Sequence, residues 1–151
     1  MSNRSLVNDV AVVGVGGAGT NIAFCLEKLG YTTIHINSST QDESAIKGAK
    51  NIRHLKGFNG CAGNRALAEK ALAENMDIVD EISSLDESIV YVIFSSAGGT
   101  GSGVSTALID MLVEETDKTI CAIVVLPDKN EDFDFHVNSY KCCQELLEIE
   151  N

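Results

Sequence analysis

Two short glycine-rich segments carry the residue types that could bind phosphate groups. Residues 14–21 read Gly-Val-Gly-Gly-Ala-Gly-Thr-Asn, and residues 96–103 read Ser-Ala-Gly-Gly-Thr-Gly-Ser-Gly. Missing side chains let a polyphosphate approach the backbone, and free N–H groups at the start of a helix attract its negative charge. Both segments are therefore candidate phosphate-binding loops.

The first loop contains the Gly-x-Gly-x-x-Gly pattern of nucleotide-binding folds. It follows an apolar run over residues 10–15 and precedes a predicted helix over residues 17–29, which is the context that gives the pattern meaning. The same glycines also suit a tight strand-to-helix turn with close packing, so a structural role stays open. The candidate contacts in this loop are Gly14, Gly16, Gly17, Ala18 and Gly19.

The second loop lies between a predicted strand over residues 89–94 and a predicted helix over residues 103–115. Four of its last six residues are glycines, which a turn seldom needs but a nest of N–H donors around phosphate does. Thr100 and Ser102 add hydroxyl groups that could donate to phosphate or contact the water shell of a metal ion. The candidate contacts are Ala97, Gly98, Gly99, Thr100, Gly101, Ser102 and Gly103.

The rest of the chain alternates between strand and helix patterns, as in an α/β fold with right-handed crossovers. Three more strands are predicted (residues 31–37, 51–55 and 119–126), and three more helices (38–47, 65–82 and 135–149). We predict a three-layer, Rossmann-like parallel sheet with strand order 3-2-1-4-5. The first and fourth strands are neighbours in that order, so both loops would face one crevice.

Two phosphate nests in one crevice suit a nucleoside triphosphate better than a dinucleotide. A dinucleotide-binding domain is expected to end its second strand with Asp or Glu, which holds the ribose hydroxyls, and this chain has Asn37 there. The Gly-x-x-x-x-Gly-Lys-[Ser/Thr] loop of P-loop enzymes is absent. An NAD- or FAD-binding Rossmann domain of an oxidoreductase stays as the alternative.

The composition of the chain excludes several classes of protein. The 151 residues, 44% of them hydrophobic, fit one domain, and the net charge of −11 argues against direct binding of nucleic acid. Five cysteines form no CxxC pair and the three histidines are scattered, so no residue is predicted to ligate a structural metal. No apolar run is long enough for a membrane span, and a polar start over residues 1–9 favours a cytoplasmic protein.

The second loop resembles the signature of the tubulin/FtsZ family, with Ala97 in place of its first glycine, and residues 14–21 resemble that family's first nucleotide loop. The resemblance extends over essentially the whole chain, 1–151, and in style is closer to the TubZ-type plasmid or phage segregation proteins than to cell-division FtsZ. It implies a GTP-binding domain that uses GTP/GDP and Mg²⁺. It also implies a GTPase that self-associates into cytoskeletal filaments, with a DNA-binding adaptor as a further partner.

The resemblance also assigns residues outside the two loops. Asn21 matches an asparagine near the guanine, and residues 37–41 match a loop near the phosphates and magnesium. Ser39 replaces the aspartate of that loop, and Asp42 could substitute for it. The contacts implied here are Asn21, Asn37, Ser38 and Gln41.

Two later segments complete the implied site. Residues 60–64 resemble the loop that senses the γ-phosphate, although Asn64 suits a helix N-terminus equally well. Glu131, four residues after Pro127, matches a sugar-contacting glutamate, while Phe135 stands where the family has arginine. The contacts implied here are Cys61, Ala62, Gly63, Asn64, Pro127 and Glu131.

The family's long central helix and the acidic loop beyond it have no counterpart among residues 1–151. Hydrolysis would therefore need carboxylates from an adjacent subunit, and no residue of this chain is assigned as catalytic. We expect the acidic residues of the 128–134 loop to be solvated charges. A non-hydrolysing regulatory or interaction form of the same fold is a further alternative, and the choice of guanine over adenine stays open.

Overall fold

The apolar runs of the sequence form one parallel sheet in the computed structural model, which describes residues 6–58 and 64–149. Its strands are β1 (Val10–Val15), β2 (Thr32–Asn37), β3 (Ile52–His54), β4 (Ile89–Ser95) and β5 (Thr119–Val125). Their order is β3-β2-β1-β4-β5, so the predicted α/β sheet topology is confirmed. Strand β1 lies between β2 and β4, where Gly14 is opposite both His35 and Ile93.

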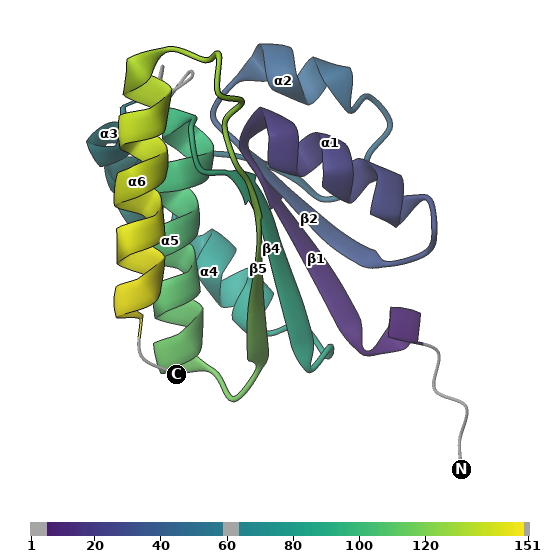
Figure 1. The fold of residues 1–151 in the computed structure, drawn as a ribbon. Coiled ribbons are helices and arrows are strands. Elements are labelled where there is room, and N and C mark those ends of the chain that lie inside the picture. Colours follow the sequence, from purple (N-terminus) through teal and green to yellow (C-terminus); the bar gives the residue numbers. More distant parts are fainter. Residues whose placement is uncertain (1–5, 59–63, 150–151) are drawn as a thin grey trace.

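Helices cover both faces of this sheet (Figure 1). A short 3₁₀ turn (Leu6–Asn8) precedes β1, and the helices are α1 (Gly16–Glu27), α2 (Thr40–Ala45), α3 (Arg65–Ala73), α4 (Met76–Ser83), α5 (Gly99–Glu115) and α6 (Phe133–Glu148). Among the described residues, no helix has the length and apolarity that a membrane crossing requires.

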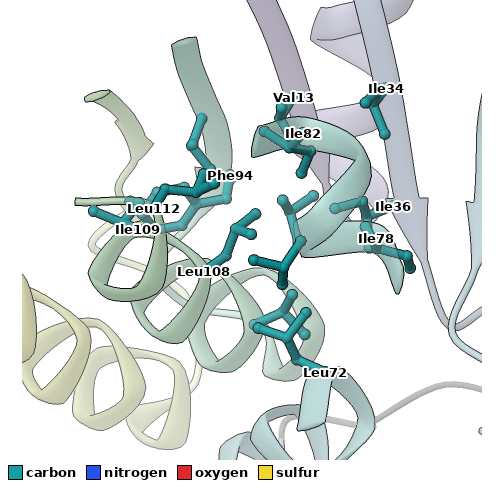
Figure 2. Close-up of a cluster of buried hydrophobic side chains, with 14 of the residues drawn as sticks. Val13, Ile34, Ile36, Leu72, Ile78, Ile82, Phe94, Leu108, Ile109 and Leu112 are labelled. Carbon is teal, nitrogen blue, oxygen red and sulfur yellow. The ribbon is translucent and has the colours of Figure 1, made fainter. Parts of the chain in front are cut away.

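The larger hydrophobic core lies between the sheet and the helices α3 to α6 (Figure 2). Strand residues such as Val13 and Phe94 meet Leu108 and Leu112 of α5 there, all with no exposed surface. A smaller core lies between α1 and the opposite face, where Val12 and Ile93 pack near Ala23. Alternate residues of β1 point to the two cores, as the pleat of a strand requires.

Two helix predictions were wrong. The helix expected over residues 65–82 is two helices. They are separated at the buried Asn75, whose side chain forms hydrogen bonds with the backbone of a turn that is distant in sequence. Its Nδ2 donates to the carbonyls of Ala71 (2.7 Å) and Lys56 (3.3 Å), and its Oδ1 accepts from the Lys56 N–H (2.9 Å). The helix expected from Gly103 begins at Gly99, so the glycines of the second loop form its first turn.

Candidate nucleotide-binding site

The two glycine-rich loops line a single cavity of about 390 Å³. It lies at the carboxyl ends of β1 and β4, where the paired strands reach Val15 and Phe94 together. The lining residues are Val15, Gly16, Gly17, Ala18, Ser39, Asp42, Ser95, Gly98, Gly99, Thr100 and Gly101. Seven of the predicted contact residues are thus brought together, as the strand order required.

Backbone geometry at the start of α1 explains part of the first loop. Gly16 has a φ of +72°, a left-handed conformation that favours glycine. A Cβ on Gly16 would lie 3.1 Å from the Gly101 backbone nitrogen, so the two loops pack directly on each other. Val15 precedes the helix without a side-chain cap, and its first turn holds no acidic residue. The N–H groups of this turn are therefore open to an anion.

The outer glycines of the first loop have a packing role. A Cβ on Gly14 would lie 2.5 Å from the carbonyl oxygen of Gly19, and one on Gly19 would lie 2.0 Å from that of Ile93. Both overlaps are with backbone, so α1 can lie against β1 and β4 only because these side chains are absent. The structural role that the sequence left open therefore exists alongside the residues that line the cavity.

The second loop ends at the N-terminus of α5, whose cap residue is Gly98. No side chain caps this helix, and its first turn also lacks an acidic residue. Gly98 has an ordinary φ of −79°, and a Cβ added there would meet no atom of the described residues within 4 Å, its two neighbours in the chain aside. Neither backbone conformation nor packing requires glycine at this position. The absence of a side chain at Gly98 leaves open space beside the N-terminus of α5.

Hydroxyl groups join the second loop to the end of β2. Ser38 Oγ lies 2.8 Å from Thr100 Oγ1, and Ser38 is fully buried. Ser102 is also fully buried, and its hydroxyl donates to the Gly98 carbonyl within α5. Thr100 is thus the loop hydroxyl that lines the cavity, while Ser102 and Gly103 lie inside the helix beneath it.

An acidic group borders the cavity from α2. Asn37 is buried, and its Oδ1 accepts from the N–H groups of Ser38 (2.8 Å) and Ser39 (3.2 Å), which fixes the turn after β2. Ser39 then caps α2 by accepting from the Asp42 N–H at 3.3 Å. Asp42 is the charged residue of the lining, and its Oδ2 lies 3.1 Å from where a Cβ of Gly17 would be. Its carboxylate therefore faces the first loop.

His54 connects α2 to the segment after β3. Its Nδ1 lies 2.6 Å from Glu43 Oε1, and its Nε2 lies 2.8 Å from the Phe58 carbonyl oxygen. The Glu43 hydrogen bond raises the pKa of His54, burial lowers it by less, and the Phe58 contact raises it further. Because both partners are acceptors, the arrangement suits the doubly protonated ring.

Several predicted contacts lie away from the lining of this cavity. Asn21 on α1 and Gln41 on α2 are exposed, and Asn64 caps α3 by accepting from the Leu67 N–H at 3.1 Å. Pro127 and Glu131 belong to the loop after β5, where the Glu131 N–H donates to the Asp128 carbonyl at 3.0 Å. Cys61, Ala62 and Gly63 lie outside the described residues.

Helix α6 contributes contacts to the second loop that the sequence did not suggest. Asn138 Nδ2 donates to the Ala97 carbonyl at 3.0 Å, and the hydroxyls of Ser96 and Ser139 lie 2.8 Å apart in the interior. These pairs are separated by 41 and 43 residues along the chain, and neither α6 residue belongs to a recognisable motif. Figure 1 shows α6 packed beside α5, and the two hydrogen bonds place Asn138 and Ser139 at the loop.

Comparisons with known proteins agree with this geometry. A model of the Tubulin/FtsZ family GTPase domain matches residues 9–151. The Tubulin-like protein TubZ of Clostridium botulinum C phage is 28% identical over 155 residues, covering 95% of this chain and 42% of that protein. The Tubulin-like protein CetZ of Methanothrix thermoacetophila is 32% identical over 123 residues, covering 78% of this chain and 34% of that protein.

The fold is also that of a solved relative. The structure of Clostridium botulinum phage c-st TubZ, truncated at its C-terminal tail, superposes with a TM-score of 0.87 at 27% identity, covering 95% of this chain and 49% of that one. This chain therefore spans less than half the length of the relatives it matches. It belongs to the Tubulin/FtsZ family, and residues 9–151 correspond to the family's GTPase domain.

Proposed function

We propose that this chain is the nucleotide-binding part of a TubZ-like polymerising GTPase and holds the phosphates of GTP or GDP in the cavity between its two loops. One observation carries the proposal: two uncapped helix N-termini, α1 and α5, meet at one cavity lined by glycines. Each N-terminus bears a partial positive charge of about +0.5 and presents unpaired N–H groups. Two such ends side by side suit a ligand with several adjacent negative charges.

Magnesium fits the same cavity. The donor set beside the phosphate loops is one carboxylate, Asp42, with the hydroxyls of Thr100 and Ser39. Mg²⁺ prefers oxygen ligands and keeps several of its waters, so a single carboxylate with phosphate oxygens is a usual arrangement. Mg²⁺ would neutralise phosphate charge there. Asp42 would then supply the negative charge that the family's loop takes from the aspartate replaced here by Ser39.

Hydrolysis and assembly belong to the longer protein in this proposal. Asp42 is the charged group of the described cavity lining, which contains no histidine, and this proposal assigns Asp42 to Mg²⁺. A carboxylate from a neighbouring subunit would therefore orient the attacking water. Nucleotide would then lie between successive copies in a filament. Segregation of plasmid or phage DNA through a separate DNA-binding adaptor is the cellular role that a TubZ-like protein would serve.

The two alternatives make different demands on the site. A dinucleotide-binding domain would use the end of β2 for ribose hydroxyls, but the Asn37 oxygen already accepts from two backbone N–H groups and the residue is buried. A non-hydrolysing form of the same fold would bind GTP at the same cavity and differ only in turnover.

Calorimetry on the purified chain with GTP, ATP and NAD, with and without magnesium, tests the proposal. A Gly98→Val variant adds a branched side chain beside the helix N-terminus, at a position where a Cβ meets no described atom within 4 Å outside the adjacent residues, and a Gln144→Ala variant on exposed α6 surface is the control. We expect magnesium-enhanced GTP binding that Gly98→Val abolishes and Gln144→Ala leaves unchanged. NAD binding that survives Gly98→Val would overturn the proposal in favour of the oxidoreductase.

A further inference from the structure

The peptide between Ala97 and Gly98 is held from outside the cavity. Asn138 of α6 donates its side-chain N–H to the Ala97 carbonyl at 3.0 Å, and Asn138 is not part of the cavity lining. Carbonyl oxygens only accept, so the side-chain amide must present its nitrogen here. The neighbouring Ser96 is fixed as well, since its N–H donates to the Val125 carbonyl at 3.0 Å.

Because that peptide is planar, the direction of its carbonyl also determines the direction of its N–H. Every described peptide bond is trans, so the Ala97 C=O and the Gly98 N–H point in opposite directions from the same plane. With the carbonyl turned to Asn138, the N–H of Gly98 points away from α6. Gly98 itself lines the cavity. The N–H of Gly98 donates to no backbone carbonyl among residues 6–58 and 64–149.

The carbonyl of Gly98 accepts from Ser102 in the first turn of α5, but the peptide on the other side of Gly98 has no such hydrogen bond within the helix. Gly98 lacks a side chain, and apart from its two neighbours no described atom lies within 4 Å of where a Cβ would be. Glycine populates positive and negative φ almost equally, so rotation of the whole Ala97–Gly98 peptide meets little local resistance. A rotated peptide would present its carbonyl oxygen to the cavity, and that oxygen would repel a phosphate.

We propose that Asn138 is a positioning residue of the phosphate site: it fixes the Ala97–Gly98 peptide so that the Gly98 N–H, rather than the Ala97 carbonyl, faces the bound polyphosphate. This inference rests on the proposed nucleotide binding and deepens it. It also makes α6 part of the site without any contact to nucleotide. A shift of α6 would turn the peptide and change the affinity for phosphate.

Two variants separate positioning from general stability. Asn138→Ala removes the donor, and Asn138→Asp replaces it with a carboxylate that repels the Ala97 carbonyl. Gln144→Ala is the control, because Gln144 is an exposed residue of the same helix and does not line the cavity. Thermal unfolding of all variants shows whether each remains folded.

The readouts are GTP affinity, guanosine affinity and the ¹⁵N–¹H signal of Gly98, all on the full 151-residue chain. Asn138→Ala should weaken GTP binding about tenfold, the scale of one hydrogen bond, and Asn138→Asp should weaken it more. Guanosine affinity should stay unchanged, and the shift of the Gly98 amide on adding GTP should shrink. Gln144→Ala should cause none of these changes.

The outcomes distinguish this inference from the proposal beneath it. A wild-type chain that binds no GTP contradicts both. A wild-type chain that binds GTP, with Asn138→Ala binding equally and showing the same Gly98 shift, overturns the role of Asn138 alone. Equal losses for GTP and guanosine would also overturn it, because positioning of one phosphate-facing peptide cannot weaken a ligand without phosphates.

Discussion

Two glycine-to-alanine substitutions should have different effects, although both glycines belong to the two glycine-rich loops. At Gly19 a Cβ would lie 2.0 Å from the Ile93 carbonyl oxygen, whereas ordinary contact begins at 3.4 Å. Helix α1 and strand β4 would have to separate by more than an ångström. At Gly98 a Cβ meets no atom within 4 Å in the part of the chain that the structure describes, apart from the adjacent residues. Gly19→Ala should therefore damage the fold, and Gly98→Ala should damage only the binding of ligand.

The expected magnitudes follow from these distances. Overpacking a core costs about 1–3 kcal/mol, and the overlap at Gly19 lies at the upper end of that range, against about 1 kcal/mol gained from the helix propensity of alanine. A net loss of about 2 kcal/mol lowers the melting temperature of a chain this size by roughly 4–8 °C. Gly98→Ala should change it by no more than about 2 °C, as open surface substitutions do.

Thermal unfolding and GTP titration of the two variants side by side form the assay. Gly98→Ala should weaken GTP binding at least about tenfold, because the methyl group occupies the space beside the helix N-terminus. Below its melting transition, Gly19→Ala should retain binding closer to that of the wild type. The reasoning is refuted if Gly98→Ala unfolds as early as Gly19→Ala, or if it binds GTP as tightly as the wild-type chain.

Three further predictions concern ionisable groups. His54→Ala should lower the unfolding free energy by about 1 kcal/mol more at pH 6 than at pH 9. The pKa of folded His54 is raised, so the stabilisation of the charged ring by Glu43 is complete below the ordinary pKa of 6.5 and is lost as pH rises through the raised value. Melting curves from pH 5 to 9 check this. Glu27→Gln should lower the unfolding free energy by about 2 kcal/mol at pH 7 in urea titrations, because its carboxylate accepts from Thr33 (2.7 Å) and lies 2.8 Å from His35 Nε2. Burial raises the pKa of Glu27, but these hydrogen bonds lower it overall. The difference in unfolding free energy between the variant and the wild type should therefore fade as pH drops below 4.5, and a constant difference would contradict this assignment. Asp42→Asn should reduce the enhancement of GTP binding by magnesium in calorimetry while leaving magnesium-free binding equal or tighter, and an unchanged enhancement would exclude Asp42 as a ligand.

The sheet and its cavity were predictable because the signals lie in short stretches of sequence. Apolar runs, each followed by a glycine-rich segment, predicted β1 and β4, and the strand order then placed both segments at one edge of the sheet. The break at Asn75 was not predictable from periodicity, since apolar positions continue at helical spacing on both sides. Its cause is a set of hydrogen bonds to Lys56, 19 residues earlier in the chain.

The lining of the candidate site was predictable where glycines mark it and less so where other side chains contribute. Glycines identify the loops, but the sequence does not separate Gly19, which packs on Ile93, from Gly98, which faces open space. That distinction depends on distances between elements. Asn138 had no signal at all, because its partner is a carbonyl oxygen, a group that every residue carries.

An amide chemical-shift titration of the ¹⁵N-labelled chain with GTP and magnesium tests the central claim most directly. We predict that the largest shifts fall on two separate segments, Gly16–Ala18 and Gly98–Gly101, which line one cavity. Shifts concentrated elsewhere would contradict the assignment of the phosphate site, for example shifts around a separate cavity that is lined by Asp110 and Glu145. A spectrum unchanged at millimolar GTP would also contradict it.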